Sequence, residues 1–328
     1  MSSVRKLSYS LALNEALHQM MASDPSVFLI GQGVKSPWYV GNTCQGLLER
    51  FGEGRVIDTP VSENCITGAA VGAAIAGMKP VVVHPRMDFM LYAMDPIINE
   101  AANWHYMNGG KASVPVVIWG IINRGGEQAA QHSQALHATF AHVPGLKVVM
   151  PSTAYDAKGL MISAIRDPNP VVFIDDRWLY GMEGEVPEEP YEVPIGKGIV
   201  RREGNDVSVI ASSFMVNLAL DAAVALAERG ISVEVIDIRS LKPIDKDLLL
   251  STVKKTGRAV VADGGWKSFG AAAEISAILS EDGFEYLKAP IKRVTLPDCP
   301  APASSALEKA YYPNEQDLVH TIQETATY

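Results

Sequence analysis

The sequence has few cysteines and no long apolar run. Its three cysteines, Cys44, Cys65 and Cys299, lie far apart, and their spacing fits neither a metal site nor a redox pair. We therefore expect reduced thiols and a cytoplasmic protein. No stretch approaches the roughly 18 consecutive apolar residues of a membrane-spanning helix, so no membrane partner is expected.

Clusters of positive charge are missing as well. The net charge is −9, and no run of Lys and Arg is longer than two residues. A protein that binds nucleic acid needs clustered cations to neutralise phosphates, so a nucleic-acid partner is not expected. The sequence also lacks a P-loop, a nucleophile elbow and a GxGxxG motif after the first predicted strand. These absences exclude the commonest nucleotide-binding and hydrolase sites.

Apolar strands and helical patterns alternate along the chain. Apolar residues at helical spacing, Leu11, Ala12, Ala16, Leu17 and Met20, predict an amphipathic first helix. Further helices are expected at 63–77, 94–108, 154–166, 214–229, 245–254 and 269–281. Strands are expected at VFLIG, PVVVHP, VPVVIWG, LKVVMPS, PVVFID, DVSVIAS, SVEVIDI, RAVVAD and IKRVTL. Such alternation predicts an α/β protein whose parallel sheets are covered by helices on both faces.

A segment rich in proline and glutamate divides this pattern into two halves. Residues 181–198, GMEGEVPEEPYEVPIGKG, are predicted to form a surface linker without regular structure. We therefore expect two three-layer domains, 1–180 and 199–328, that share a fold class without a sequence repeat.

Small residues follow a single glutamate in the stretch that starts at Asp58, DTPVSENCITGAAVGAAIAG. Ser62 can cap the following helix, and the helix dipole favours Glu63 in its first turn. Glycine inside a helix costs up to about 1 kcal/mol, so Gly68 and Gly72 indicate that another backbone or a flat ligand approaches closely. A structural and a functional role for Glu63 both stay open on these residues alone.

Three histidines, His132, His137 and His142, are spaced by five residues. One helix that supplies two metal ligands places them three or four residues apart, so we expect no metal site from this set. Gly125 and Gly126, with polar residues beside His132, predict a polar turn that leads into a helix.

Turn residues follow a predicted helix in AIRDPNPVVF, residues 164–173. Its carbonyl groups and the carboxylate of Asp167 are ligands that a hard cation prefers. An ordinary helix-to-strand turn explains the same residues. Both interpretations stay open here.

Several long strings, in order and over nearly the whole chain, resemble the beta subunits of the thiamin-diphosphate-dependent 2-oxoacid dehydrogenases, the decarboxylating components for pyruvate and branched-chain acids. These strings are DTPVSENCITGAAVGAAIAGMKPVVV, DPIINEAANWHYMNGG, QHSQALHATFAHVPGLKVVMPST, DAKGLMISAIRDPNPVVF, PIGKG, SVEVIDIRSLKPID and ADGGWKSFGAAAEI.

The resemblance implies a pyrimidine-binding domain followed by a transketolase-type C-terminal domain. It implies oxidative decarboxylation of a 2-oxoacid with acyl transfer to a lipoyl group, with a lipoyl acyltransferase core as a further partner. The alpha subunit of an α2β2 tetramer is expected to hold the diphosphate and Mg²⁺ through a Gly-Asp-Gly motif, which this chain lacks.

The resemblance also implies roles for individual residues. Glu63 matches the glutamate that hydrogen-bonds a pyrimidine nitrogen and activates the cofactor, and Phe89 matches the aromatic residue that stacks on that ring. Val61 and Tyr92 are expected to complete the pyrimidine-binding set. His132 matches the histidine that helps to pass the acyl group to a lipoyl arm. A structural potassium site, formed mainly by main-chain oxygens, is expected at Ala164, Ile165, Asp167 and Asn169.

This chain departs from the family pattern near the expected cofactor. Gln32 replaces a carboxylate that contributes to an acidic passage between the two active sites of the family. His84, Arg86 and Asp88 are expected to add charge near the pyrimidine, and Tyr92 stands where glutamine is frequent. These differences favour an altered substrate or partner.

Two other hypotheses therefore stay open. A two-subunit, transketolase-like enzyme would transfer a ketol or acyl group to an aldehyde without a lipoyl partner. A scaffold without catalytic activity would keep only the fold, although such a protein has no physical use for Glu63, Phe89 and His132 together. The sequence leaves the 2-oxoacid, the acceptor and docking to a larger complex undecided.

Overall fold

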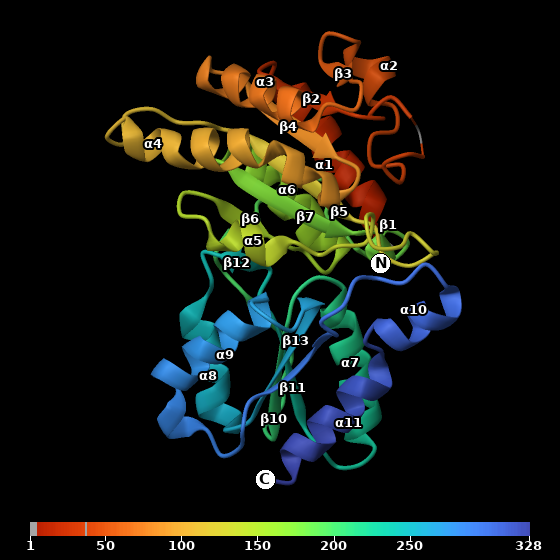
Figure 1. Ribbon diagram of the computed structural model, residues 1–328, viewed down its shortest axis with the longest axis vertical. Coiled ribbons are helices and arrows are strands. Elements are labelled where there is room, and N and C mark those ends of the chain that lie inside the picture. Colours follow the sequence, from red (N-terminus) through yellow and green to blue (C-terminus); the bar gives the residue numbers. More distant parts are fainter. Residues whose placement is uncertain (1–4, 37) are drawn as a thin grey trace. The chain divides into compact units, whose positions relative to one another are not determined.

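The computed structural model describes residues 5–36 and 38–328, and its chain divides into two compact units (Figure 1). The first unit holds Met1–Arg124 and Thr139–Ile195, and the second holds Gly125–Ala138 and Gly196–Tyr328. The segment Gly125–Ala138 thus groups with the C-terminal half although it lies within the N-terminal half of the sequence.

The first unit is built on a parallel sheet. Its strands are β2 (Val27–Gly31), β3 (Val56–Asp58), β4 (Lys79–His84), β5 (Val117–Ile122), β6 (Lys147–Val149) and β7 (Val171–Asp176). They run in the order β6-β7-β5-β4-β2-β3, and every neighbouring pair is parallel. Every residue of β2, β5 and β7 is buried. This burial explains why their sequences are continuous apolar runs, as expected for a sheet covered on both faces.

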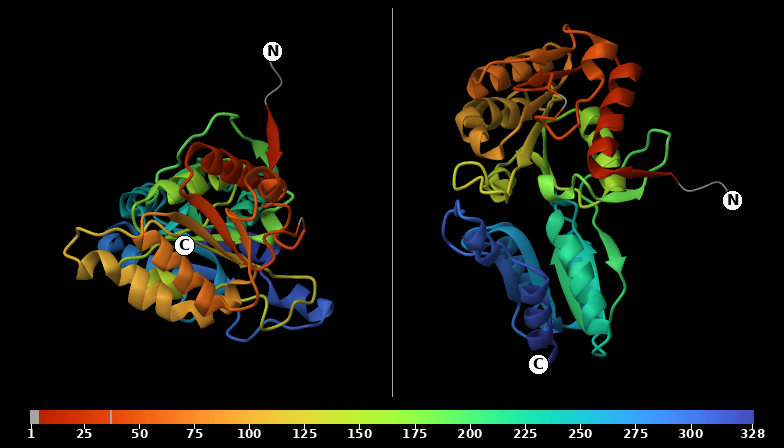
Figure 2. Two further views of the ribbon diagram at one scale, coloured as in Figure 1. Left: turned by 90° about the horizontal axis from the view of Figure 1, so that it is seen from above. Right: turned by 90° about the vertical axis from the view of Figure 1, so that its right-hand side faces the viewer.

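Helices cover both faces of this sheet. They are α1 (Tyr9–Ser23), α2 (Leu47–Phe51), α3 (Glu63–Ile75), α4 (Asn103–Met107) and α6 (Ala154–Arg166), with the 3-10 helices η1 (Met87–Ala93) and η3 (Arg177–Leu179) and the π-helix η2 (Asp95–Ala102). α1 packs against α6 on one face, whereas α3 packs against β4, η1 and η2 on the other (Figures 1 and 2).

The predicted helices are present with two changes. Leu11 was expected on the buried face of the first helix but is 41% exposed, because the buried stripe of α1 runs through Ala12, Ala16 and Leu17. The helix predicted at 94–108 is divided into η2 and α4. α1 begins after Ser8, whose side chain accepts a hydrogen bond from the backbone N–H of Leu11.

The prediction that 181–198 has no regular structure is wrong at one end of the segment. Glu183–Glu185 forms strand β8, which pairs antiparallel with β1 (Lys6–Ser8). β8 ends before Pro187, so proline removes none of its hydrogen bonds, and both glutamates are exposed. The predicted domain boundaries, 1–180 and 199–328, stay a prediction, and residues 1–4 lie outside the described part of the chain.

The second unit has three layers. Its strands β9 (Ile199–Arg202), β10 (Val207–Ala211), β11 (Val233–Asp237), β13 (Ala259–Trp266) and β14 (Lys292–Leu296) lie in the order β14-β13-β10-β11-β9. All pairs are parallel except β9 with β11, an antiparallel edge strand that the sequence did not predict. Strand β12 (Ser240–Lys242) follows β11.

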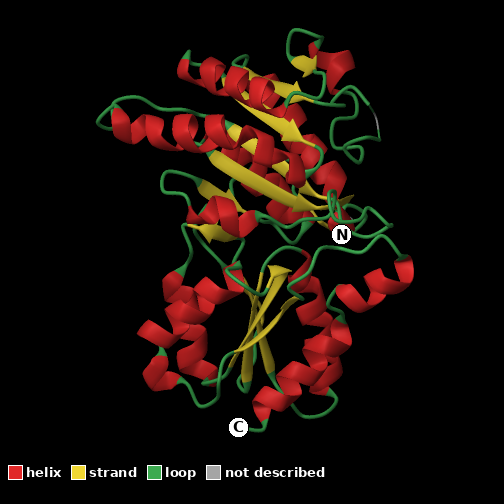
Figure 3. Cartoon of the chain, viewed as in Figure 1, coloured by secondary structure: helices red, strands yellow, loops and turns green. Residues whose placement is uncertain are grey.

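Helices flank the second sheet on both sides, red around yellow strands in Figure 3. They are α7 (Phe214–Ala227), α8 (Lys246–Thr256), α9 (Ala271–Asp282), α10 (Ser305–Tyr311) and α11 (Glu315–Ala326). The short helix α5 (His137–His142) contains the point, between Ala138 and Thr139, where the chain passes from the second unit to the first. One core joins α7 and α11 to β10, β11 and β13. α8 and α9 cover the other face (Figure 1). The α/β fold class predicted from the sequence is confirmed.

No helix within residues 5–36 and 38–328 combines the length and the apolar character needed to cross a membrane. The three cysteines, all in the described part of the chain, are free thiols.

Candidate active site

The predicted cofactor-binding residues of the first unit follow the carboxyl ends of its parallel strands. β3 ends at Asp58 and leads to Glu63, while β4 ends at His84 and leads to Phe89. Because the strands are parallel, these ends lie at one edge of the sheet. β3 lies on one side of β2, and β4 lies on the other side. The connections that follow β2 and β4 therefore lead toward opposite edges of the sheet, which makes the gap between these two parallel strands a topological switch point. Open α/β sheets bind ligands outside such a switch point.

Glu63 is a half-buried carboxylate at the start of α3. Within the described part of the chain it has no hydrogen-bond or ion-pair partner. The expected cap is wrong: Ser62 occupies the N-cap position with ψ 60°, and its side chain caps no N–H. By contrast, Ser8 at the start of α1 has ψ 156° and does accept such a bond. Glu63 is therefore available to a ligand.

The two glycines of α3 and Ala76, which follows the helix, do not pack closely within the described chain. Gly68, Gly72 and Ala76 are exposed. A Cβ added at Gly72 would meet no atom within 4 Å, and one at Gly68 would meet only Pro96 Cβ, at 4.0 Å. The close approach that the sequence indicated is thus not made inside the chain, and this helix face is open to another molecule.

The predicted pyrimidine-binding residues lie around the same helix. Phe89 is half-buried on η1, and η1 packs against α3. Val61, two residues before Glu63, is 65% exposed, and Tyr92 on η1 is 71% exposed. Val61 thus lies just before α3, Phe89 and Tyr92 lie on the 3-10 helix that contacts α3, and Val61 and Tyr92 are uncovered.

His84 contributes no charge at neutral pH, contrary to the prediction from the sequence. It is buried at the end of β4, and its Nε2 lies 3.1 Å from the hydroxyl of Thr67 on α3. Burial lowers the pKa of His84 to about 4. A neutral imidazole is the form that a dry interior favours, so His84 joins α3 to β4 rather than adding charge to the site.

Two buried aspartates end β7. Asp176 forms an ion pair with Arg124, whose Nε lies 2.8 Å from Asp176 Oδ2. Asp175 accepts a hydrogen bond of 2.9 Å from the hydroxyl of Tyr180. Burial raises the pKa of Asp175 to about 7, more than the hydrogen bond from Tyr180 lowers it. Burial raises the pKa of Asp176 as well, although Arg124 acts in the opposite direction.

Replacing Asp175 with Asn is expected to stabilise the protein at pH 8 and to change little at pH 5. The folded-state pKa of about 7 lies above the unfolded value of about 3.9. Stability therefore falls as the pH rises from about 4 through 7. The amide keeps an acceptor for Tyr180 and removes the buried charge. We expect a gain of roughly 1–3 kcal/mol at pH 8 by urea unfolding, and an equal effect at both pH values would contradict this explanation.

His132 lies in the second unit, in a turn of the segment Gly125–Ala138. It is half-buried, and its backbone N–H donates a hydrogen bond of 3.4 Å to the backbone carbonyl of Ala129. The carboxylate of Glu127 accepts from the N–H of Ser305 at 3.1 Å, and the N–H of Glu127 donates to Glu308 at 2.9 Å. The predicted polar turn is present, and α10 holds its start.

The sequence did not reveal a buried contact between a histidine and an aspartate that holds the end of this segment. His137 Nε2 lies 2.9 Å from Asp263 Oδ1, and both side chains are almost fully buried. The N–H groups of Gly265 and Ala272 donate to the two oxygens of Asp263 at 3.1 and 3.3 Å. Although burial acts in the opposite direction, His137 and these N–H groups lower the pKa of Asp263.

The predicted potassium residues surround an ordinary helix end. Ala164 and Ile165 are buried in the last turn of α6, and Asp167 follows it. Both carboxylate oxygens of Asp167 are used: Oδ1 accepts from the N–H of Asn169 at 2.9 Å, and Oδ2 lies 2.5 Å from Nζ of Lys147. In the described part of the chain, Oδ1 of Asn169 is buried without a hydrogen-bond donor.

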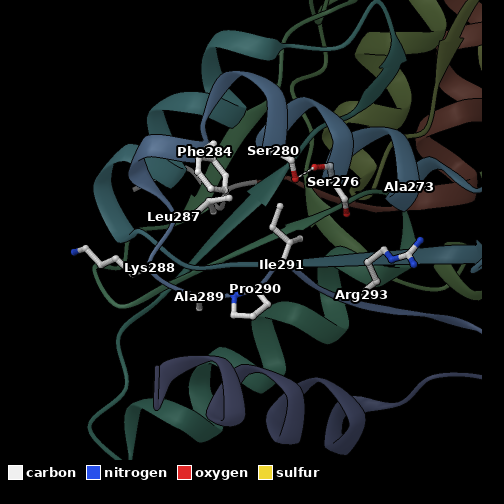
Figure 4. Close-up of a pocket in the computed structure, with 10 residues that line it drawn as sticks. All are labelled: Ala273, Ser276, Ser280, Phe284, Leu287, Lys288, Ala289, Pro290, Ile291 and Arg293. Carbon is white, nitrogen blue, oxygen red and sulfur yellow. Dashed lines mark hydrogen bonds between the residues drawn. The ribbon is translucent and has the colours of Figure 1, made fainter.

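Side-chain metal sites are absent from residues 5–36 and 38–328, where no three His, Cys, Asp or Glu residues gather. A pocket of about 720 Å³ in the second unit contains none of the predicted site residues. Figure 4 shows Phe284 and Leu287 near one end of it and Arg293 at the other. It therefore gives no support to the predicted chemistry.

Comparisons with known proteins agree over nearly the whole chain. Residues 5–182 match the family model "Transketolase, pyrimidine binding domain", and residues 196–318 match "Transketolase, C-terminal domain". The beta subunit of acetoin:2,6-dichlorophenolindophenol oxidoreductase from Cupriavidus necator is 45% identical, with 98% of each chain covered. The beta subunit of the pyruvate dehydrogenase E1 component from Rickettsia felis is 44% identical, with 97% of each chain covered.

Two solved structures share the fold. A split-gene transketolase, described as an inactive beta4 tetramer, has a TM-score of 0.79 at 24% identity, with 98% of each chain covered. A transketolase from Leishmania mexicana has a TM-score of 0.72 at 18% identity, with 100% of this chain and 46% of that chain covered. At these identities the likeness shows the fold alone.

Proposed function

Because the chain belongs to the beta subunits of the thiamin-diphosphate-dependent 2-oxoacid dehydrogenases, we propose that Glu63 activates the cofactor and that Phe89, Tyr92 and Val61 hold its pyrimidine ring. When bound, thiamin diphosphate supplies a nucleophilic carbon that attacks the substrate carbonyl. The chain's own contribution is to hold the ring and to share a proton with one of its nitrogens through Glu63.

One observation carries this proposal. The Glu63 carboxylate is half-buried at the carboxyl edge of the sheet and has no partner in the described chain. A partly buried carboxylate is stabilised by hydrogen bonds to its oxygens. A ring nitrogen that shares a proton supplies one, so the residues present fit the group.

We propose that an alpha subunit covers the open surface around Glu63 in an α2β2 tetramer. The small residues of α3, the exposed Val61 and Tyr92, and the 46% exposed Leu91 form an apolar surface that water would otherwise contact. Since no acidic cluster occurs in the described residues, we place Mg²⁺ and the diphosphate mainly on the alpha chain.

We propose a structural K⁺ at the end of α6. The free oxygen of Asn169 and the carbonyl groups of the last turn are suitable ligands for a hard cation. The ion pair between Asp167 and Lys147 leaves the Asp167 carboxylate little capacity for a second cation. Main-chain oxygens of Ala164, Ile165 and Asp167 would therefore supply most of the coordination.

We propose that the acyl group passes to a lipoyl group, with His132 assisting that step, and that the protein acts in the cytoplasm. The free thiols support this location. The donor is a 2-oxoacid; acetoin is the second candidate, because one relative at 45% identity is an acetoin oxidoreductase subunit.

Replacing His132 with Ala is expected to slow acyl transfer more than decarboxylation. An imidazole in a polar turn can assist transfer, and general acid–base assistance is worth about 10²–10⁴-fold. In the assembled complex, dye reduction reports decarboxylation and acylation of a lipoyl domain reports transfer. Equal losses in both assays would contradict the proposed role, and a lipoyl domain that is never acylated would favour an aldehyde acceptor.

A further inference from the structure

Two arginines stand at the edge of the first sheet where Glu63 and Phe89 also lie. Arg86 comes two residues after the end of β4 and is the N-cap residue of η1. Arg177 directly follows β7. Only β5 separates these parallel strands, so both arginines leave the sheet at its carboxyl edge.

The two guanidinium groups interact with each other, and neither has a carboxylate bound to it as an ion pair in the described part of the chain. Burial, and next the positive charge of Arg177, lower the pKa of Arg86. In the described part of the chain neither arginine forms an ion pair. Asp176 pairs with Arg124 instead, and Asp175 accepts from Tyr180. The carboxylate of Asp88 acts on the pKa of Arg86 in the opposite direction, but less than Arg177 does, so the two half-buried like charges still repel each other.

Most of their hydrogen-bond donors are unused. Arg86 donates to the carbonyl of Pro85 at 2.9 Å, and Arg177 donates to the carbonyl of Tyr39. The Nε of each arginine is buried and has no acceptor within the described residues. Buried donors without an acceptor are rare in native proteins and costly, so a ligand that accepts hydrogen bonds is the missing partner.

The loop after β2 joins the two arginines. The guanidinium carbon of Arg86 lies 5.8 Å from the ring centre of Tyr39, whose backbone accepts from Arg177. Gln32 donates to the hydroxyl of Tyr39 at 3.0 Å and, being neutral, adds no counter-charge. A Cβ at Gly33 would lie 2.1 Å from the Tyr39 ring. Tyr39 is thus fixed beside both cations, at the switch point between β2 and β4.

We propose that Arg86 and Arg177 bind a second anionic group of the substrate. The inference rests on the proposed function and names its substrate class: a 2-oxoacid that carries a further carboxylate or phosphate. Guanidinium groups bind both anions through paired, charge-assisted hydrogen bonds. The N–H of Phe89 donates to the carbonyl of Arg86 at 3.2 Å. The anion therefore lies within one turn of the residue proposed to hold the cofactor ring.

A matched pair of substrates tests the carboxylate. 2-Oxopentanoate and 2-oxoglutarate have equal carbon chains and differ only in a terminal methyl or carboxylate group. In the complex assembled with its alpha chain and cofactor, we expect a KM at least tenfold lower for the dicarboxylate. Arg86→Gln or Arg177→Gln should raise that KM about tenfold, the effect of one lost charge-assisted hydrogen bond. The same variants should leave the KM for the monocarboxylate unchanged.

A binding measurement separates this inference from the proposed activity. Titration calorimetry of the assembled complex with glutarate and with inorganic phosphate requires no turnover. Tighter binding of glutarate indicates a carboxylate substrate, and tighter binding of phosphate indicates a phosphorylated one. Binding that both variants weaken about tenfold supports the site even if no 2-oxoacid is a substrate, in which case the proposed function alone fails.

Two further variants complete the design. Arg166→Gln removes an exposed guanidinium of the same unit that is paired with Glu192, and it should change neither binding nor KM. Arg86→Lys keeps the positive charge but lacks the planar guanidinium group with its paired N–H donors. Its affinity for the anion should therefore lie between those of the unmodified complex and Arg86→Gln. It also replaces Arg86→Gln in the test if that variant does not fold. The inference is wrong if neither anion binds the unmodified complex, or if binding is the same in all four variants.

Discussion

Replacing Glu63 with Gln is expected to lower the turnover of the assembled complex by about 10²–10⁴-fold. The amide has nearly the same shape as the carboxylate but cannot hold or share a proton with a ring nitrogen. Because Glu63 has no partner in the described chain, the substitution breaks no internal contact. Folding and assembly with the alpha chain should therefore be unchanged.

The measurement is dye reduction at saturating thiamin diphosphate, with gel filtration as the check on assembly. Glu53→Gln is the matched control: Glu53 is an exposed carboxylate of the same unit, paired with Lys35 at 2.8 Å. It should keep the activity of the unmodified complex. If Glu63→Gln works within about threefold of that activity, the proposed role of Glu63 is excluded.

Replacing Asp263 with Ala is expected to destabilise the second unit by about 3–5 kcal/mol. The change leaves the buried His137 without its partner, and it leaves the N–H groups of Gly265 and Ala272 without an acceptor. Removing one member of a buried pair destabilises a protein more than replacing both members with apolar residues, because the remaining polar group stays buried without a partner. Asp263→Asn keeps one acceptor oxygen, so its free energy of unfolding should lie between those of the unmodified chain and Asp263→Ala.

Acid should remove the same contribution. His137 and two N–H groups lower the folded-state pKa of Asp263 below its ordinary value, against the effect of burial. The contribution is therefore complete above the unfolded pKa of about 3.9 and declines as the pH falls through the folded value. In Asp263→Ala this part of the acid sensitivity should be absent.

Chemical unfolding of the full chain followed by circular dichroism measures these differences. Asp282→Ala is the control, because Asp282 forms an exposed ion pair with Lys246 on the same unit. Such pairs contribute about 1 kcal/mol or less. If Asp263→Ala lowers the free energy of unfolding no more than Asp282→Ala does, the buried contact between His137 and Asp263 does not stabilise the unit.

The main strands and helices could be predicted because burial produces a clear pattern in the sequence. VFLIG forms the fully buried β2, and the helix predicted at 154–166 is α6 without change. The short strands β1, β3, β8, β9 and β12 were not predicted, because edge strands are partly exposed and carry charged residues. Their formation depends on a partner strand far away in the chain.

The candidate site also has features that the sequence predicts and features that depend on the three-dimensional structure. Glu63 and Phe89 were assigned by resemblance, and the structure adds that Glu63 is unpartnered in the described chain. The charge of His84 was wrongly predicted, because burial and its pKa depend on three-dimensional packing. No sequence pattern connects His137 with Asp263 or Arg86 with Arg177. These pairs come together only through the order of the strands.

We expect this chain, together with an alpha partner, to decarboxylate a 2-oxoacid through thiamin chemistry. Dye reduction by the co-purified chains, with thiamin diphosphate, Mg²⁺ and a panel of 2-oxoacids and acetoin, tests it most directly. We expect reduction with at least one 2-oxoacid, dependent on the alpha chain. Bound cofactor with no reduction by any member of the panel would contradict the claim and favour the transketolase-like alternative.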